Sequence, residues 1–169
     1  MKATELLADA YGRIQEVVHE SVEGLSADEL AARLDDQANS IGWLVWHLTR
    51  VQDDHVAEVA ELEQVWTAGG WADRFGLPLP ADATGYGQTS EQVGAVLVGS
   101  DALLLGYYDA VHQQTVTFLR GLTAADLERV VDERWDPPVT LGARLVSVLS
   151  DDLQHAGQAA FVRGVLRRR

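Results

Sequence analysis

Apolar residues recur at intervals of three and four positions through most of the chain, the spacing typical of amphipathic helices. In the first segment, residues 5–23, they are Leu6, Leu7, Ala10, Ile14, Val17, Val18 and Val22. Similar patterns predict long helices over residues 40–66, 89–120 and 141–166. Strand-like alternation is nearly absent, so the sequence predicts an all-α four-helix bundle.

Two short segments with nearly the same residues follow the first and third of these helices. Residues 24–30 read GLSADEL and residues 121–127 read GLTAADL. Ser26 and Glu29 have the spacing of a capping box, which predicts a short helix over residues 27–34. The echo predicts that the order of helix, short helix and long helix occurs twice, so that the bundle has two similar halves.

Residues 68–88 interrupt the helical pattern. They contain the helix breakers Gly69, Gly70, Pro78, Pro80, Gly85 and Gly87 and the apolar residues Trp71, Phe75 and Leu77. Such a stretch inside a compact domain is usually functional or packed over other elements, and we expect it to cover one end of the bundle. A valine-rich segment, residues 130–139, can be extended, but we expect no sheet there.

Length and composition predict one domain. A chain of 169 residues with 47% hydrophobic content can bury a full core, so we expect a single bundle domain over residues 1–169. Its 13 basic and 26 acidic residues give a net charge of −13, which disfavours nucleic acid and anionic membranes as partners. There is neither the pattern of a secretory signal nor an apolar run of membrane-spanning length, so we expect a cytoplasmic protein.

The absence of cysteine narrows the chemistry. It excludes disulfides, thiolate metal sites and a cysteine nucleophile. Any metal must therefore be bound by nitrogen and oxygen. Zinc, nickel, iron and manganese all accept such ligands.

The last predicted helix carries polar residues on its apolar stripe. Asp151 and His155 are four residues apart and stack on one helical face, while Asp152 lies within the stripe itself. A buried carboxylate requires a cation, hydrogen bonds or a metal. One interpretation is structural: Arg50 neutralises Asp151 or Asp152, and His155 is a hydrogen-bonded core residue.

His47 favours a metal site instead. It lies on the helix that the internal repeat makes the counterpart of the last helix, so His47 and His155 can face each other across the bundle. Two imidazoles and a carboxylate leave open metal positions for water or substrate. We therefore predict His47, Asp151 and His155 as ligands of a divalent metal.

Two sequence segments indicate a family. Residues 43–48 (WLVWHL) and 151–158 (DDLQHAGQ), with the two-halved layout, resemble the DinB-like superfamily, which includes YfiT-like hydrolases and mycothiol- and bacillithiol-dependent transferases. The resemblance spans essentially the whole chain. In that superfamily the metal commonly has three histidine ligands, and Asp151 stands where one of them is expected. The maleylpyruvate isomerase branch is similar in using a carboxylate there; Asp152 is the rival ligand, or it orients an imidazole.

The resemblance implies a function. It implies a metal-dependent transferase that activates a low-molecular-weight thiol, mycothiol, for transfer to a small electrophile, with zinc or nickel bound at His47, Asp151 and His155. It also implies a homodimer. The alternatives are a metal-dependent hydrolase of YfiT type and a non-enzymatic, stress-related bundle that binds a ligand.

Four residues are predicted to contact substrate: Trp43, Arg50, Asp54 and Trp71. Asp54 follows His47 by seven residues and so shares its helical face. Trp43 and Trp71 are expected near the mouth of the site, although aromatic residues at helical spacing are also typical of core packing. No residue is assigned a catalytic role.

Overall fold

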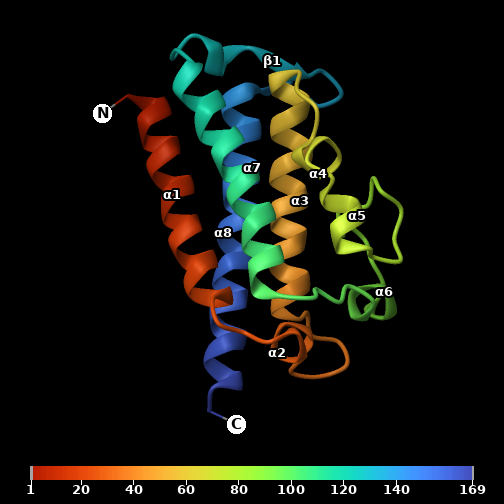
Figure 1. Ribbon diagram of the computed structural model, residues 1–169. Helices are drawn as coiled ribbons and strands as arrows, with labels where there is room; N and C mark the ends of the chain where they lie inside the picture. The colour runs from red at the N-terminus through yellow and green to blue at the C-terminus, as the bar shows by residue number, and fades with distance from the viewer. Residues whose placement is uncertain (1, 169) are drawn as a thin grey trace.

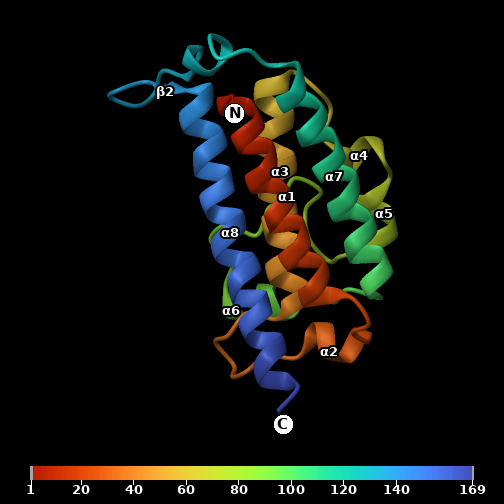
Figure 2. The ribbon, with the colours of Figure 1, turned by 90° about the vertical axis from the view of Figure 1, so that its left-hand side faces the viewer.

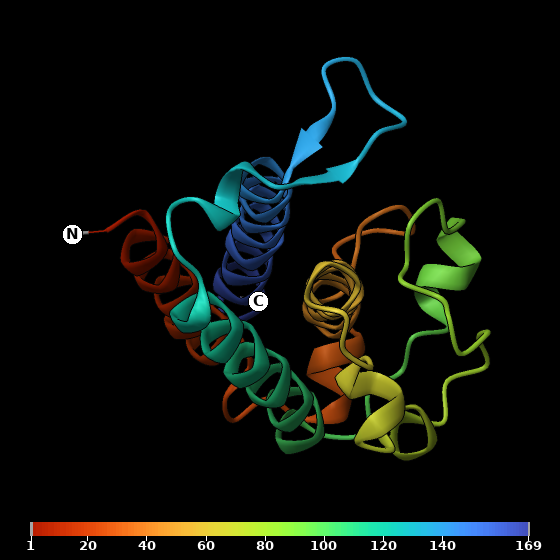
Figure 3. The same ribbon diagram turned by 90° about the horizontal axis from the view of Figure 1, so that it is seen from above.

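The computed structural model describes residues 2–168, and most of them are helical (Figure 1). Its four long helices are α1 (Ala3–Val22), α3 (Ile41–Ala60), α7 (Asp101–Gly121) and α8 (Leu141–Leu166). Helices α1 and α3 each pack against both α7 and α8 (Figure 3). The predicted all-α bundle is confirmed. None of the described helices is both long and apolar enough to cross a membrane.

The short elements lie outside this bundle. They are α2 (Ala27–Ala31), α4 (Val65–Ala68), α5 (Trp71–Phe75), α6 (Ser90–Gly94) and the 3-10 turn η1 (Asp126–Glu128). Helix α2 lies below the bundle, whereas α4, α5 and α6 lie beside α3 (Figures 1 and 2). Residues 61–100, which we call the covering segment, therefore cover the side of α3. Our expectation that residues 68–88 would cover one end of the bundle was wrong.

Two predicted helices are shorter than the periodicity indicated. The helix predicted over residues 40–66 ends at Ala60, because Glu61 adopts a left-handed conformation with φ of 56°. The helix predicted over residues 89–120 is interrupted between α6 and α7. Ser100 begins α7, its hydroxyl accepting a hydrogen bond from the backbone N–H of Leu103 at 3.1 Å. Local capping therefore overrides the apolar periodicity at both positions.

A small hairpin precedes α8. Strands β1 (Val130–Asp132) and β2 (Val139–Thr140) pair antiparallel, so the expectation that no sheet would form was wrong. The hairpin projects sideways from the N-terminal end of α8 (Figure 2). The Asp132 carboxylate anchors it, accepting hydrogen bonds from Arg134 in the turn at 2.8 Å and from Arg144 on α8 at 3.1 Å.

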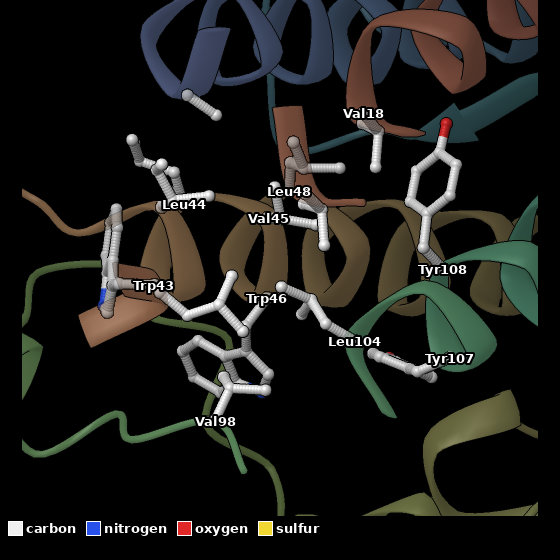
Figure 4. Packing of buried hydrophobic residues seen from close by; sticks show 14 of the residues in the cluster. Val18, Trp43, Leu44, Val45, Trp46, Leu48, Val98, Leu104, Tyr107 and Tyr108 are labelled. Atoms are coloured by element: carbon white, nitrogen blue, oxygen red, sulfur yellow. The ribbon is translucent and has the colours of Figure 1, made fainter. Parts of the chain in front are cut away.

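Helix α3 is the most deeply buried element near its start. Every residue from 41 to 50 is buried, so this stretch has no solvent-exposed face. In Figure 4, Val45 and Leu48 extend from one side of α3, whereas Trp46 extends from the other side toward Val98. The covering segment supplies that second contact. It converts α3 from a surface helix of the bundle into a core helix.

A buried ion pair fastens the covering segment to α3. Arg50 and Asp53 lie 3.6 Å apart with both side chains fully buried. The Asp53 carboxylate accepts hydrogen bonds from the backbone N–H groups of Val65 and Trp66 and from the Tyr107 hydroxyl, each at 2.8 Å. Burial raises the pKa of Asp53, and these hydrogen bonds oppose that increase.

Replacing Asp53 should therefore destabilise the fold. Asp53→Ala leaves the buried Arg50 guanidinium without its counter-charge and two backbone N–H groups without their acceptor. We therefore expect a loss of about 3–5 kcal/mol in the free energy of unfolding. Urea denaturation measures this loss. Asp9→Ala, which removes an exposed partner of Arg13, is the control and should leave the midpoint unchanged. A wild-type midpoint for Asp53→Ala would contradict the assigned role.

Candidate metal centre

His47 is held from two sides in the middle of α3. Only 6% of its surface is exposed, and its ring stacks on Trp43 with a centroid distance of 4.6 Å. Nδ1 of His47 donates a hydrogen bond to the backbone carbonyl of Thr84 at 2.5 Å. This bond fixes the tautomer and leaves Nε2 with a free lone pair.

Gly85 allows the covering segment to approach this closely. Its φ of +95° lies in the left-handed region, and a Cβ at this position would lie 2.6 Å from Nδ1 of His47. Both the backbone conformation and the contact therefore require glycine. From the sequence alone Gly85 was predicted only as a helix breaker, because nothing in the sequence connects it with His47.

His155 and Asp151 approach His47 from α8. The rings of His47 and His155 have centroids 4.9 Å apart. Nδ1 of His155 donates to the side-chain oxygen of Gln158 at 2.8 Å, so its Nε2 also keeps a free lone pair. That Nε2 lies 3.7 Å from Oδ1 of Asp151. Three potential ligands thus meet between α3 and α8.

The three side chains fit a divalent ion. Ligand atoms of His47, Asp151 and His155 all lie within 4.8 Å of one another, and no other group of this kind occurs among residues 2–168. Oδ2 of Asp151 is buried without a hydrogen-bond partner, as expected of a carboxylate oxygen whose partner is an ion. Burial lowers the pKa of His47, which favours the neutral imidazole that binds metals.

Asp152 has a different environment. It is fully buried, and neither carboxylate oxygen has a hydrogen-bond partner. Burial, together with the charge of Asp151, raises the pKa of Asp152 well above its ordinary value, which favours the protonated carboxyl group. Asp151 is the carboxylate that the structure places beside the two histidines.

A cavity of about 400 Å³ adjoins the ligands. It is lined by His47, Val51, Asp54, His55, Thr84, Tyr86, Ser147, Val148 and Asp151. Asp54, one of the predicted substrate contacts, lies in this wall, and its Oδ1 accepts a hydrogen bond from Gln64 at 2.7 Å. Apart from His47, Asp54 and Asp151, the residues of the wall were not predicted from the sequence, because they are spread over three separate segments without a shared motif.

The other predicted substrate contacts lie outside this cavity. Trp43 is buried against His47, and its indole N–H donates to Gln88 at 2.8 Å. Arg50 belongs to the buried ion pair with Asp53. Trp71 packs on Tyr107 with a centroid distance of 5.8 Å. All three residues therefore contact other parts of the protein instead of lining this cavity. Trp43 packs against His47, one of the three potential metal ligands.

A helical bundle that brings two histidines and one aspartate together in this way defines a class of candidate metalloproteins with nitrogen and oxygen ligands. The chain belongs to the mycothiol-S-transferase family, whose model matches residues 7–168. This family is part of the DinB/YfiT-like superfamily, as the sequence resemblance implied.

One solved structure is very similar. It is described as the conserved protein of a locus from Enterococcus faecalis, with 29% sequence identity and a TM-score of 0.93. The match covers 100% of this chain and 99% of that chain. No curated protein matches the sequence.

Gly85 offers a test of how His47 is oriented. In Gly85→Ala, the new methyl group pushes against the imidazole and disturbs its bond to Thr84, and we expect metal affinity to fall by about 10- to 100-fold. Isothermal titration calorimetry with zinc measures the change. Gly87→Ala is the matched control: Gly87 also has positive φ, of +70°, but a Cβ there meets nothing within 4 Å. Equal affinities in the two variants would contradict the assigned contact.

Proposed function

We propose that the protein is a metal-dependent S-transferase that joins a low-molecular-weight thiol of the mycothiol type to a small electrophile. The proposal assigns the metal to His47, Asp151 and His155. The observation that carries it is the convergence of these ligand atoms within 4.8 Å in a member of the mycothiol-S-transferase family. Zinc and nickel both suit this donor set.

The ligand set suits the activation of a thiol. A divalent ion bound by two neutral imidazoles and one carboxylate keeps open positions and would lower the pKa of a coordinated thiol, so that the thiolate forms near neutral pH. The chain contains no cysteine, so the nucleophilic sulfur has to come from the cosubstrate. The residues of the protein would then bind and orient the two reactants.

The cavity of about 400 Å³ is the proposed place for the electrophile. Asp54 contributes a carboxylate to its wall, and the charge of Asp151 would be offset by the ion that it is proposed to bind. His55 also lines it, and Arg144 donates a hydrogen bond to Nδ1 of His55 at 2.9 Å. This leaves the proton of neutral His55 on Nε2, where it can be donated to an acceptor.

Metal content tests the ligand assignment. We expect His47→Ala and His155→Ala to lose the stoichiometric metal of the freshly purified protein, because two ligands hold an ion more weakly than three. Elemental analysis by mass spectrometry measures it. His55→Ala removes a histidine from the same cavity but not from the ligand set, and should keep its metal. If His47→Ala retains as much metal as the wild type, the proposed site is wrong.

The same measurement separates the two adjacent aspartates. Asp151→Asn should lower the metal content, since an amide oxygen is a poorer ligand than a carboxylate. Asp152→Asn should retain the metal, because Asp152 lies outside the ligand group and the amide has nearly the same shape as the carboxyl group that it replaces. The opposite result would assign the carboxylate ligand to Asp152.

Turnover tests the reaction class. With the metal-loaded protein, we expect loss of an electrophile such as a haloalkane to require both mycothiol and the metal. Mass spectrometry of the thioether product measures the transfer. His47→Ala, with its metal removed, serves as the inactive control. Hydrolysis of amides or esters at the same rate with and without thiol would instead identify a hydrolase.

A further inference from the structure

A second cavity, of about 520 Å³, lies further along α8 toward its C-terminal end. Its walls are the turn of residues 37–39, the first turn of α3, and α8 from Gln154 to Val162. It begins about one helical turn beyond Asp151, so it is a neighbour of the proposed metal centre. None of its lining residues belongs to the first cavity.

The lining of this second cavity is uncharged. Its polar side chains are the amides of Gln37, Asn39, Gln154 and Gln158, and no ionisable residue takes part. This is unusual in a chain whose net charge is −13. We call it the amide cavity. A carboxylate or an ammonium group would find no counter-charge there, so an uncharged ligand suits it best.

Hydroxyl groups match the amide side chains. Each amide offers both an N–H donor and a carbonyl acceptor, and a hydroxyl group uses both. Phe161, which is 64% exposed, adds an apolar surface on which the C–H face of a saturated ring can pack. The amide cavity therefore fits a ring that bears several hydroxyl groups and no charge.

Gln158 connects the amide cavity with the metal centre. Its side-chain oxygen accepts the hydrogen bond from Nδ1 of His155, while the same side chain lines the cavity. Among the described residues, no hydrogen bond uses the N–H₂ group of Gln158, which leaves two donors for a ligand. A molecule bound in the cavity would thus contact the residue that orients a proposed metal ligand.

Gly157 is one of the residues that line the amide cavity. Glycine in the middle of a helix destabilises it relative to alanine. A Cβ at Gly157 would meet nothing within 4 Å, so no contact within the chain requires glycine there. In a residue that lines a cavity next to Gln158, this free space suits a molecule from outside the chain.

We propose that the amide cavity binds an uncharged, hydroxyl-bearing ring that forms part of the thiol cosubstrate, remote from its sulfur. The thiol then reaches the metal centre from the side of Gln158, and the electrophile reaches it from the first cavity. This inference rests on the proposed function, because it assigns a place to one of the two reactants.

Filling the cavity with a side chain tests the inference. Gly157→Leu should fold with unchanged or higher thermal stability and keep its metal, while the KM for mycothiol rises by about tenfold or more. The KM for 2-mercaptoethanol, a thiol without a ring, should stay unchanged. Gly12→Leu is the matched control, because Gly12 also lies in a long helix with open space at its Cβ but lines neither cavity. An equal rise for both thiols, or none for mycothiol, overturns the proposal.

A binding measurement is independent of activity. Saturation-transfer NMR with methyl glucoside should give a signal with the wild type and with His47→Ala, and a much weaker one with Gly157→Leu. Glucuronate, the anionic counterpart, should give less than methyl glucoside. Absence of the glucoside signal from the wild type, or its persistence in Gly157→Leu, overturns the proposal. If the purified wild type contains no metal but still gives the glucoside signal, the proposed function is wrong, whereas the binding of a hydroxyl-bearing ring in the amide cavity is not contradicted.

Sedimentation of the same variants examines a competing use of this face of α8. Gly157→Leu should sediment like the wild type at every concentration. A change in oligomeric state would show that a second copy of the chain occupies the cavity, and the inference would be wrong.

Discussion

The burial of polar side chains on α3 is the constraint on which the rest of the structure depends. His47, Arg50 and Asp53 are buried on α3, where an unpaired polar group is costly. The covering segment supplies their partners. The Thr84 carbonyl accepts from His47, the Ala83 carbonyl accepts from Arg50, and two backbone N–H groups bind Asp53. The segment that completes the core therefore also orients the first proposed metal ligand.

The two histidines reach the same geometry by different means. His155 is oriented within its own helix, by Gln158 three residues later, whereas His47 depends on a carbonyl 37 residues away along the chain. The α8 half of the site is therefore encoded locally, and the α3 half exists only once the covering segment has packed. Damage to that segment should disturb His47 before it disturbs His155, because the hydrogen bond of His155 does not involve it.

This difference also explains how much of the site the sequence could predict. Helical periodicity was sufficient to predict the bundle. The four-residue spacing alone left Asp151 and His155 open to a structural interpretation, and the internal repeat and the family resemblance were needed to predict them, with His47, as metal ligands. A backbone carbonyl has no residue signature, so the role of Thr84 could not be predicted. Trp71 was expected near the site, but its position depends on where the covering segment packs. The left-handed Glu61 and the cap at Ser100 ended helices that apolar spacing alone would have continued.

The surroundings of the ligands differ on the two sides of the site. Carboxylates of Asp54 and Asp151 border the first cavity, whereas the second has only amide and apolar groups. A reaction that joins a thiol to an electrophile needs to bring two different molecules to one point without exchanging their places. A charged and an uncharged cavity can distinguish the two molecules before either reaches the ligands. A charged group on a molecule finds polar partners in the first cavity but no counter-charge in the second. Under the proposed function, charge rather than size would assign each reactant to its side, since the volumes of about 400 and 520 Å³ are similar.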